Sequence, residues 1–383
     1  MKRIEIELNK RIDKNEFSKI VGFLSEDILE YRIQDDKLIV EVEDSTDIGS
    51  FIKNVEKISV KFRTNDNEEV IFENPQKHNG YINSFECVKS FSEGMLTLTG
   101  QALFLYKYFD EIFEYLLYDV FKNDVCELIE KLYPVMLPVS SYRKTGYLKR
   151  SPQYSIFCST VIEDITVLEN MDELTEDEYQ SIMNSPKYSL SPSACFHVYE
   201  EYANQELPKN TIVTFVQSVF RNEGRFNFSQ FGRMKDYHVR EMVFIGDEEF
   251  VNLSRSKMIQ RINEYIKSIN MNAKMQVASD PFVLPKMQTF KKIQKMEKSK
   301  YELLLAYNDE KYMSVASFNL HGSAFTYPFS ITVKGKETVT GCIGFGLERF
   351  VLCFLSQYGE NVENWPEIIK KSYNNYTMKI END

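Results

Sequence analysis

The chain has 383 residues, of which 43% are hydrophobic and 14% aromatic, enough to form the cores of one large domain and one small domain. Its formal net charge of −11 argues against a surface coated for nucleic-acid binding, although a local basic face is compatible with it. The first residues alternate in charge and no apolar run approaches the ~18 residues of a membrane span. We therefore expect a cytoplasmic protein that is neither secreted nor membrane-spanning.

Residues 1–65 are predicted to form a small α+β domain with the order βαββαβ. Alternating apolar residues indicate strands, and Asp13 and Asp47 stand where helix-capping residues belong. No side chain in this segment indicates chemistry, so its predicted role is packing or docking. The expected elements are a strand over 4–8, a helix from 14, a hairpin over 31–42, a helix from 48 and a strand over 58–62.

Residues 66–84 are predicted to be a linker, and residues 85–383 a large second domain. Thr99 precedes apolar residues at helical spacing, which predicts a long helix. Asp124 is expected to cap another helix, which Pro134 would end because proline cannot continue it.

Further along, a strand is predicted to end in the sequence FRNE at 220–223. Side chains two residues apart share one face of a strand, so Arg221 and Glu223 should project into the same space. A guanidinium suits phosphate, and a carboxylate can accept a hydrogen bond from an amino group. The alternative is a structural ion pair at the surface of a sheet.

The next strand carries Glu241 on an apolar face, where an unpaired carboxylate is costly. The alternative here is an ion pair with Arg240. The six cysteines show no paired spacing, which in a cytosolic chain favours free thiols or metal ligands over disulfides. Cys195, Glu241 and Cys342 form a possible zinc-binding set, because zinc accepts thiolate and carboxylate ligands, although Cys195 alone is typical of a small buried residue.

A glycine-punctuated strand over 340–346 leads into an apolar helix, with Arg349 near the start of that helix. Glycines let a backbone approach a ligand closely. Together, FRNE at 220–223 and GFGLERF at 344–350 resemble motifs 2 and 3 of class II aminoacyl-tRNA synthetases. The segment LYPVMLP at 132–138 is similar to the loosely defined motif 1 of that family, which forms the dimer interface, and so implies a homodimer.

The resemblance covers the chain from about residue 85 to its end and points to one branch of the class II enzymes, the methanogen-type seryl-tRNA synthetases and the related amino acid:[carrier protein] ligases. It implies an α+β fold with a mainly antiparallel six-stranded sheet flanked by helices. Neither the helical hairpin of the bacterial seryl enzymes nor the larger tRNA-binding domain of the methanogen type is evident in the sequence. Segments that look closer to the carrier-protein ligases are 278–282, 300–303, 317–321 and 365–366.

By this resemblance, the site would use ATP, Mg²⁺ and Zn²⁺. Arg221 would hold the α-phosphate of ATP, Glu223 would accept from the adenine amino group, and Arg349 would lie along the adenine and reach the γ-phosphate. Glu302 would be a ligand of the magnesium ion, and Asn319 would line the pocket for the substrate side chain. Zinc on Cys195, Glu241 and Cys342 would receive the substrate amino group. By contrast, His238, His321 and Cys353 are expected to be structural.

The leading hypothesis is therefore ATP-dependent amino-acid activation through an aminoacyl-adenylate, with transfer to the phosphopantetheine thiol of a carrier protein. The alternatives are a seryl-tRNA synthetase-like enzyme that charges tRNA or another acceptor, and a non-catalytic paralogue that only binds a partner. Intact Arg221, Glu223 and Arg349 argue against the paralogue. Two basic patches are either solvated surface or docking sites for a small acidic partner: Arg143, Lys144, Lys149 and Arg150, and Lys286, Lys291, Lys292, Lys295 and Lys300.

Overall fold

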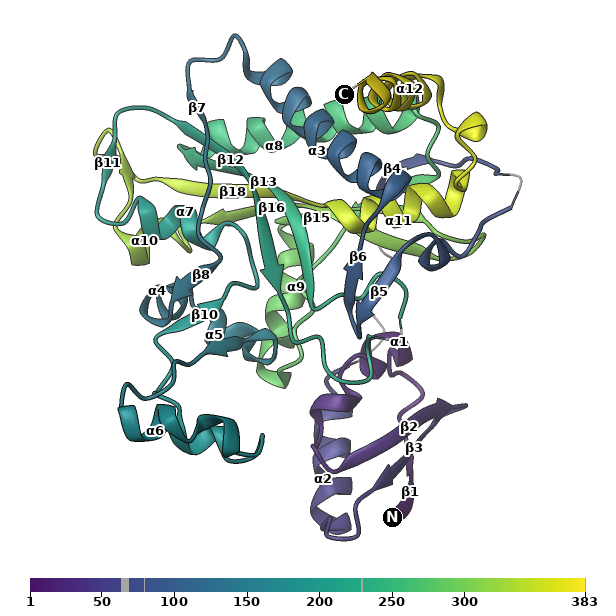
Figure 1. The fold of residues 1–383 in the computed structure, drawn as a ribbon, viewed down its shortest axis with the longest axis vertical. Helices are drawn as coiled ribbons and strands as arrows, with labels where there is room; N and C mark the ends of the chain where they lie inside the picture. Colours follow the sequence, from purple (N-terminus) through teal and green to yellow (C-terminus); the bar gives the residue numbers. More distant parts are fainter. Residues whose placement is uncertain (63–68, 79, 229, 383) are drawn as a thin grey trace.

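An eight-stranded sheet forms the centre of the large domain in the computed structural model, which describes residues 1–62, 69–78, 80–228 and 230–382. The strand order is β4-β14-β15-β16-β18-β13-β12-β7 (Figure 1). All neighbouring pairs are antiparallel except β12 and β7, which are parallel. The strands are β4 (Val70–Asn74), β7 (Glu127–Glu130), β12 (Thr211–Phe220), β13 (Asp236–Gly246), β14 (Ala273–Val277), β15 (Lys300–Ala306), β16 (Tyr312–Gly322) and β18 (Val339–Gly346).

The predicted α+β fold, with a mainly antiparallel sheet flanked by helices, is confirmed. The six strands from β14 to β12 are extended at the two edges of the sheet by β4, which is also antiparallel, and by β7, which is parallel. One face is covered by α3 (Gly100–Phe121), α8 (Glu248–Ser268) and α11 (Leu347–Tyr358), which bury the largest apolar core (Figure 1). The other face carries shorter helices over a second core, leaving room there for a cavity.

The elements on this second face and at the ends of the chain are mostly short. The helices are α4 (Val139–Lys144), α5 (Tyr147–Arg150), α6 (Ile165–Glu169), α7 (Phe196–Glu201), α9 (Gln288–Met296), α10 (Thr326–Phe329) and α12 (Glu367–Asn382). The strands are β5 (Lys89–Ser92), β6 (Met95–Thr97), β8 (Met136–Pro138), β9 (Ile156–Cys158), β10 (Tyr188–Leu190), β11 (Glu206–Leu207) and β17 (Thr332–Val333). Short 3₁₀ helices are η2 (Ser84–Cys87), η3 (Pro152–Tyr154), η4 (Met171–Glu173), η5 (Tyr179–Ile182), η6 (Pro285–Met287) and η7 (Val362–Asn364).

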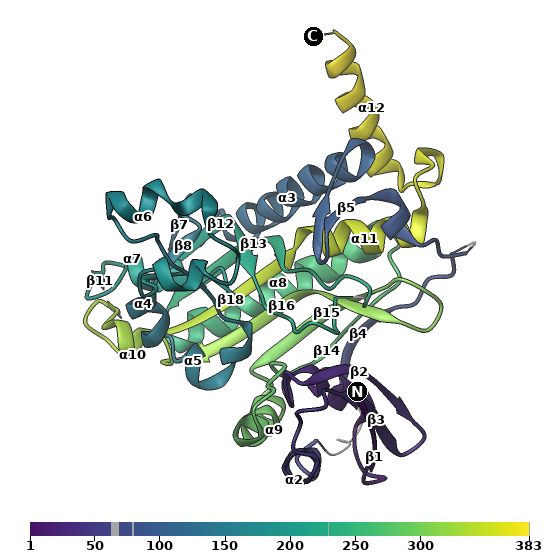
Figure 2. The same ribbon diagram turned by 60° about the horizontal axis from the view of Figure 1, so that its bottom comes forward.

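The N-terminal unit is a three-stranded sheet of order β1-β3-β2 with helices packed on it. Asp13 and Asp47 cap its two helices as predicted, each accepting hydrogen bonds from backbone N–H groups of the first turn. It lies against the large domain beside α9 (Figure 2). Its elements are β1 (Lys2–Glu7), α1 (Lys14–Ser18), the 3₁₀ helix η1 (Val21–Phe23), β2 (Ile28–Gln34), β3 (Lys37–Val42) and α2 (Ile48–Ser59).

Three predictions about the elements were wrong. The expected strand over 58–62 is absent because α2 runs to Ser59: Val55, Ile58 and Phe62 share helical spacing, and Val55 and Phe62 are buried in the small core. The expected linker over 66–84 contains β4, which pairs with β14, although residues 66–68 and 79 lie outside the described residues.

The third error concerns the helix expected between Asp124 and Pro134. This segment instead forms β7, whose backbone pairs with the edge of β12 and extends the sheet. Among the described residues, no helix combines the length and the apolar character needed to cross a membrane.

Candidate active site

A cavity of about 680 Å³ opens on the sheet face opposite α3, α8 and α11, and we call it the large cavity. Its walls come from β12, β13, β15, β16 and β18, and from α9 and the segments around η3 and α7. Seven of the eight residues with predicted site roles line it: Cys195, Arg221, Glu241, Glu302, Asn319, Cys342 and Arg349. Glu223 is the exception.

Cys195, Glu241 and Cys342 meet at one end of the large cavity, and we call them the Cys-Glu-Cys cluster. Their ligand atoms all lie within 4.8 Å of one another, and all three residues are buried. Sheet register explains part of this arrangement, because β13 pairs Val243 with Cys342 and therefore Glu241 with Gly344. A Cβ at Gly344 would lie 2.6 Å from Oε2 of Glu241, so only a glycine leaves room for the carboxylate.

The electrostatics of the cluster are strained without a cation. Burial raises the pKa of the Glu241 carboxyl well above its usual range, and Cys195 raises it further. The hydrogen bond between the two thiols lowers the pKa of Cys195 and raises that of Cys342. Two thiols and a carboxylate are the donor set that zinc accepts, so these residues fit the metal that the sequence implied. They are the one such group of three found in the part of the chain that the structure describes.

Arg221 and Arg349 present positive charge to the same cavity. Their guanidinium carbons lie 5.8 and 5.1 Å from the centroid of the Tyr237 ring. Each Nε donates to a backbone carbonyl, of Pro192 for Arg221 and of Gly232 for Arg349. Within the described ranges, no carboxylate forms an ion pair with either arginine, in contrast to Arg240. Two guanidinium groups without counter-charges on one cavity make an anion site.

Glu223 does not share the large cavity with Arg221. β12 ends at Phe220, so the alternation of a strand does not extend to the residues that follow it. The Glu223 side chain is buried in a neighbouring small cavity against the N-terminal unit, and its Oε2 lies 3.1 Å from Nη1 of Arg233. Tyr154 lines both cavities and separates them. The prediction that Arg221 and Glu223 project into the same space was therefore wrong.

The two ion pairs considered from the sequence are also absent. Arg240 instead pairs with carboxylates of α3 and β7, whereas Glu241 on the next position points to the opposite face of the sheet. Glu302 lies on the large cavity with its carboxylate 3.3 Å from Nζ of Lys300. Asn319 donates to Oγ of Ser317 and lies 3.6 Å from Sγ of Cys342.

Sequence reasoning missed an acid–base pair on the wall of the large cavity. Asp280 accepts from Lys300 Nζ at 2.9 Å and from Gln294 Nε2 at 2.9 Å. Burial raises the pKa of Asp280, but Lys300 outweighs it and holds the pKa well below its usual range. The only signal for the pair was that each residue lies in a segment resembling the carrier-protein ligases.

The histidines and Cys353 behave largely as expected. His238 Nδ1 lies 2.7 Å from Glu348 Oε1, and Cys353 is buried in the main core. His321 lies nearer the chemistry than expected, since its Nε2 is 3.7 Å from Sγ of Cys342. Burial lowers the pKa of His321 to about 3, so the imidazole is neutral.

Comparisons with known proteins bear on the large domain as a whole. Residues 178–358 match the tRNA synthetase class II core domain (G, H, P, S and T). A type-2 serine–tRNA ligase of Methanococcus aeolicus is 28% identical over 257 residues, covering 63% of this chain and 49% of that protein. An amino acid–[acyl-carrier-protein] ligase 1 of Bradyrhizobium diazoefficiens is 26% identical over 246 residues, covering 62% of this chain and 74% of that ligase.

Among solved structures, the M. kandleri SerRS in complex with A. aeolicus tRNASec superposes with a TM-score of 0.69 at 19% identity, covering 98% of this chain and 77% of that one. This likeness establishes the fold alone. The chain spans about half the length of the serine–tRNA ligases that it matches. Residues 178–358 therefore form a region similar to the class II tRNA synthetase core domain, and the chain is similar to methanogen serine–tRNA ligases and to an amino acid–[acyl-carrier-protein] ligase.

Proposed function

We propose that this protein activates an amino acid with ATP and transfers it to the phosphopantetheine thiol of a carrier protein. The observation that carries the proposal is the meeting, in one cavity, of two guanidinium groups without counter-charges and the Cys-Glu-Cys cluster. The two guanidinium groups suit a polyphosphate, and the Cys-Glu-Cys cluster suits a metal that accepts an amine. An ATP-dependent ligase acting on an amino acid can use both in one cavity.

In the first step, a carboxylate oxygen of the amino acid forms a bond to the α-phosphorus of ATP. The bond from that phosphorus to the bridging oxygen breaks, and pyrophosphate leaves with the electron pair. Arg221 holds the α-phosphate and offsets the charge that develops there. Arg349 lies along the adenine and reaches the γ-phosphate. Glu302 is the proposed protein ligand for the magnesium ion that accompanies ATP.

Cys195, Glu241 and Cys342 would hold zinc, which when bound supplies a Lewis-acid position for the free amino group of the substrate. Asn319, next to Cys342, lines the space for the substrate side chain. In the second step, the acceptor thiol sulfur bonds to the carbonyl carbon of the adenylate, AMP leaves, and the thiol proton passes to solvent.

The surface of α9 supports a carrier protein as the acceptor. Phe290 and Ile293 are exposed and line the large cavity, and Lys286 and Lys292 are exposed next to them. A basic and apolar surface at the cavity opening is complementary to a helix of a small acidic protein. Lys291, which the sequence grouped with these lysines, is excluded because it forms an ion pair with Glu16 of the N-terminal unit.

The second candidate is the charging of tRNA, and the similarity to type-2 serine–tRNA ligases favours it. Against it stands the net charge of −11, because tRNA affinity relies on many phosphate contacts. In either case we propose a homodimer. Leu132, Val135 and Met136 expose large apolar side chains in the segment similar to motif 1.

The activation step is tested by ATP–pyrophosphate exchange screened over the amino acids. Arg221→Ala and Arg349→Ala should each lower exchange about a hundredfold or more without unfolding the protein, because these side chains act on the transition state. Arg32→Ala, at an exposed arginine of the N-terminal unit, is the matched control and should exchange normally. Normal exchange in either cavity variant would remove the assigned roles, and no exchange with any amino acid would favour the non-catalytic paralogue.

The acceptor is tested by offering the radiolabelled amino acid to total tRNA and to a panel of phosphopantetheinylated carrier proteins. We expect a carrier to be labelled, and Lys292→Glu to reduce that labelling while exchange stays normal. Lys336→Glu, a charge reversal at an exposed lysine in the turn after β17, is the control. Efficient charging of tRNA with no carrier labelled would overturn the acceptor proposal while leaving the activation step intact.

A further inference from the structure

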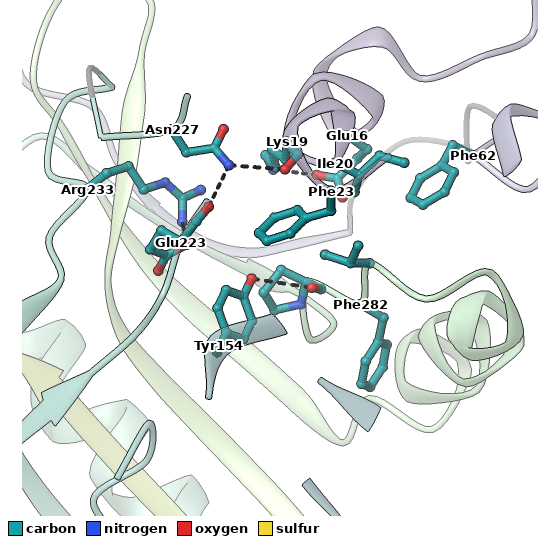
Figure 3. Close-up of a pocket in the computed structure, with 12 residues that line it drawn as sticks. Glu16, Lys19, Ile20, Phe23, Phe62, Tyr154, Glu223, Asn227, Arg233 and Phe282 are labelled. Atoms are coloured by element: carbon teal, nitrogen blue, oxygen red, sulfur yellow. Dashed lines mark hydrogen bonds and ion pairs between the residues drawn. The ribbon is translucent and has the colours of Figure 1, made fainter. Parts of the chain in front are cut away.

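The N-terminal unit packs directly on the loop between β12 and β13, the loop that begins with FRNE. Figure 3 shows the small cavity at this contact, with Phe23, Lys19 and Ile20 of the N-terminal unit facing Glu223, Asn227 and Arg233 of the loop. Contacts of this kind link the N-terminal unit to Glu223, the residue that the family resemblance assigns to adenine.

Two phenylalanines interlock across the contact, each packed on a glycine of the other side. A Cβ on Gly224 would lie 2.7 Å from Cζ of Phe23, and Gly224 also has a φ of +86°, which favours glycine. A Cβ on Gly22 would lie 3.0 Å from Cδ2 of Phe226. The Phe226 ring also meets Tyr31 edge-on, with the centroids 5.3 Å apart. Both sides of the contact are therefore shaped for each other.

Hydrogen bonds fix the same loop to backbone carbonyls of the N-terminal unit. Arg225 Nη2 donates to the carbonyls of Ser25 and Glu26, at 3.1 and 2.7 Å. Asn227 Nδ2 donates to the carbonyl of Lys19 at 3.1 Å and to that of Glu223 at 2.7 Å. One amide group thus connects the N-terminal unit to the backbone of Glu223 (Figure 3).

An ion pair joins the N-terminal unit to α9 as well. Nζ of Lys291 lies 2.6 Å from Oε2 of Glu16, and the Lys291 side chain is mostly buried. Burial raises the pKa of Glu16, but Lys19 and Lys291 outweigh it and lower that pKa to about 2. The pair is therefore charged at neutral pH, and the N-terminal unit contacts the loop and α9 at once.

We infer that the N-terminal unit positions the adenine end of the ATP site, with Phe23 and Asn227 as positioning residues that fix Glu223 through its backbone. The inference rests on the proposed function and on the role that the family resemblance implies for Glu223, acceptance from the adenine amino group, with Glu223 placed in the small cavity beside the large one. A loop joining two strands is costly to order, and a loop already held in place binds its ligand without that cost. Misplacing Glu223 should weaken ATP binding and leave the chemical step largely unchanged, because adenine is held equally before and during the reaction.

The test substitutes the N-terminal side alone, in the full-length protein. Gly22→Leu would displace the Phe226 ring from its contact with residue 22. It should raise the Kd of ATP, measured by calorimetry, and the KM for ATP, measured by ATP–pyrophosphate exchange, each about tenfold. The kcat of exchange should change little. Gly49→Leu is the matched control: it lies in the same unit, is exposed, and its Cβ would meet only its own cap at 3.5 Å.

A charge exchange provides a test that does not depend on the folding of Gly22→Leu. Glu16→Lys and Lys291→Glu should each raise the Kd of ATP, and the double variant should restore it in part, because the pair is re-formed with opposite signs while Lys19 loses its own pair with Glu16. An unchanged or lower Kd in Gly22→Leu and in both single charge variants would overturn the inference. A wild-type protein that binds ATP but shows no exchange would instead contradict the proposed function.

Discussion

Arg240 and Glu241 are neighbours on β13, and their side chains leave the sheet on opposite faces. Arg240 is 3% exposed and Glu241 is 4% exposed, so the two residues are buried to the same extent. Arg240 meets the carboxylates of Asp110, Glu130 and Glu114 at 2.6, 3.5 and 3.8 Å. Glu241 meets two thiols and, among the described residues, forms no ion pair. A buried charge that the fold has compensated is structural, whereas one left uncompensated marks a site that awaits a ligand.

The same contrast separates the arginines of the candidate site. Arg233 neutralises Glu223, while Arg221 and Arg349 donate, among the described residues, to backbone carbonyls alone and face the large cavity. Glu241, Arg221 and Arg349 therefore line a single cavity, and none of the three forms an ion pair with another described residue. A carboxylate that suits a cation and guanidinium groups that suit an anion match the proposed substrate set of amino acid and nucleotide.

The largest expected effect is loss of metal from the Cys-Glu-Cys cluster. We expect about one zinc per chain by elemental analysis, and none in Cys195→Ala or Cys342→Ala, because each change removes a ligand from a site with three. Cys158→Ala, at a partly buried cysteine in β9, should keep its metal. A metal-free wild-type protein that activates amino acids normally would contradict the zinc site.

The next largest effect is expected on the free energy of unfolding when the neighbours Arg240 and Glu241 are substituted separately. Arg240→Met should lower the free energy of unfolding by about 3 kcal/mol, because it leaves partly buried carboxylates without their cation. In protein treated with a chelator, Glu241→Gln should be neutral or stabilising, because it removes a buried carboxyl whose raised pKa costs folding free energy at neutral pH. Urea denaturation of both variants checks this, and equal destabilisation would remove the contrast between the two faces.

Much of the fold could be predicted from the sequence because periodicity reports local structure. The pair of strands around the FRNE loop and the passage from β18 into α11 are found as predicted. The strand expected over 58–62 failed because apolar residues there satisfy helical spacing as well. The helix expected from Asp124 failed because pairing with the edge of β12 is a long-range term that no local pattern contains.

Less of the candidate site could be predicted from local sequence patterns. Cys195, Glu241 and Cys342 lie on three separate elements, and only a family resemblance joined them before the sheet register did. Glu223 was misassigned to the space of Arg221 because the strand stops at Phe220. The docking of the N-terminal unit on the loop depends on tertiary contacts alone, which is why its sequence indicated packing or docking but not the surface that it would contact.

The smallest expected effect lies on the structural face of β13, which His238 shares with Arg240. Its Nδ1 and backbone N–H lie 2.7 and 2.9 Å from the carboxylate of Glu348, in the first turn of α11. This hydrogen bond raises the pKa of His238 above 6.5, burial opposes it, and Asp236 and Asp110 add to the rise. The pKa of His238 is higher in the folded protein than in the unfolded chain. The stabilisation of the fold by the His238–Glu348 pair is therefore complete below pH 6.5 and is lost as pH rises through the folded pKa. His238→Gln should therefore lower the Tm more at pH 6 than at pH 9, and thermal unfolding at both values measures this. Since the imidazole is partly exposed, the difference should be small. An equal loss of Tm at both values would mean that His238 packs on this face as a neutral ring, outside the set of compensated charges that Arg240 represents.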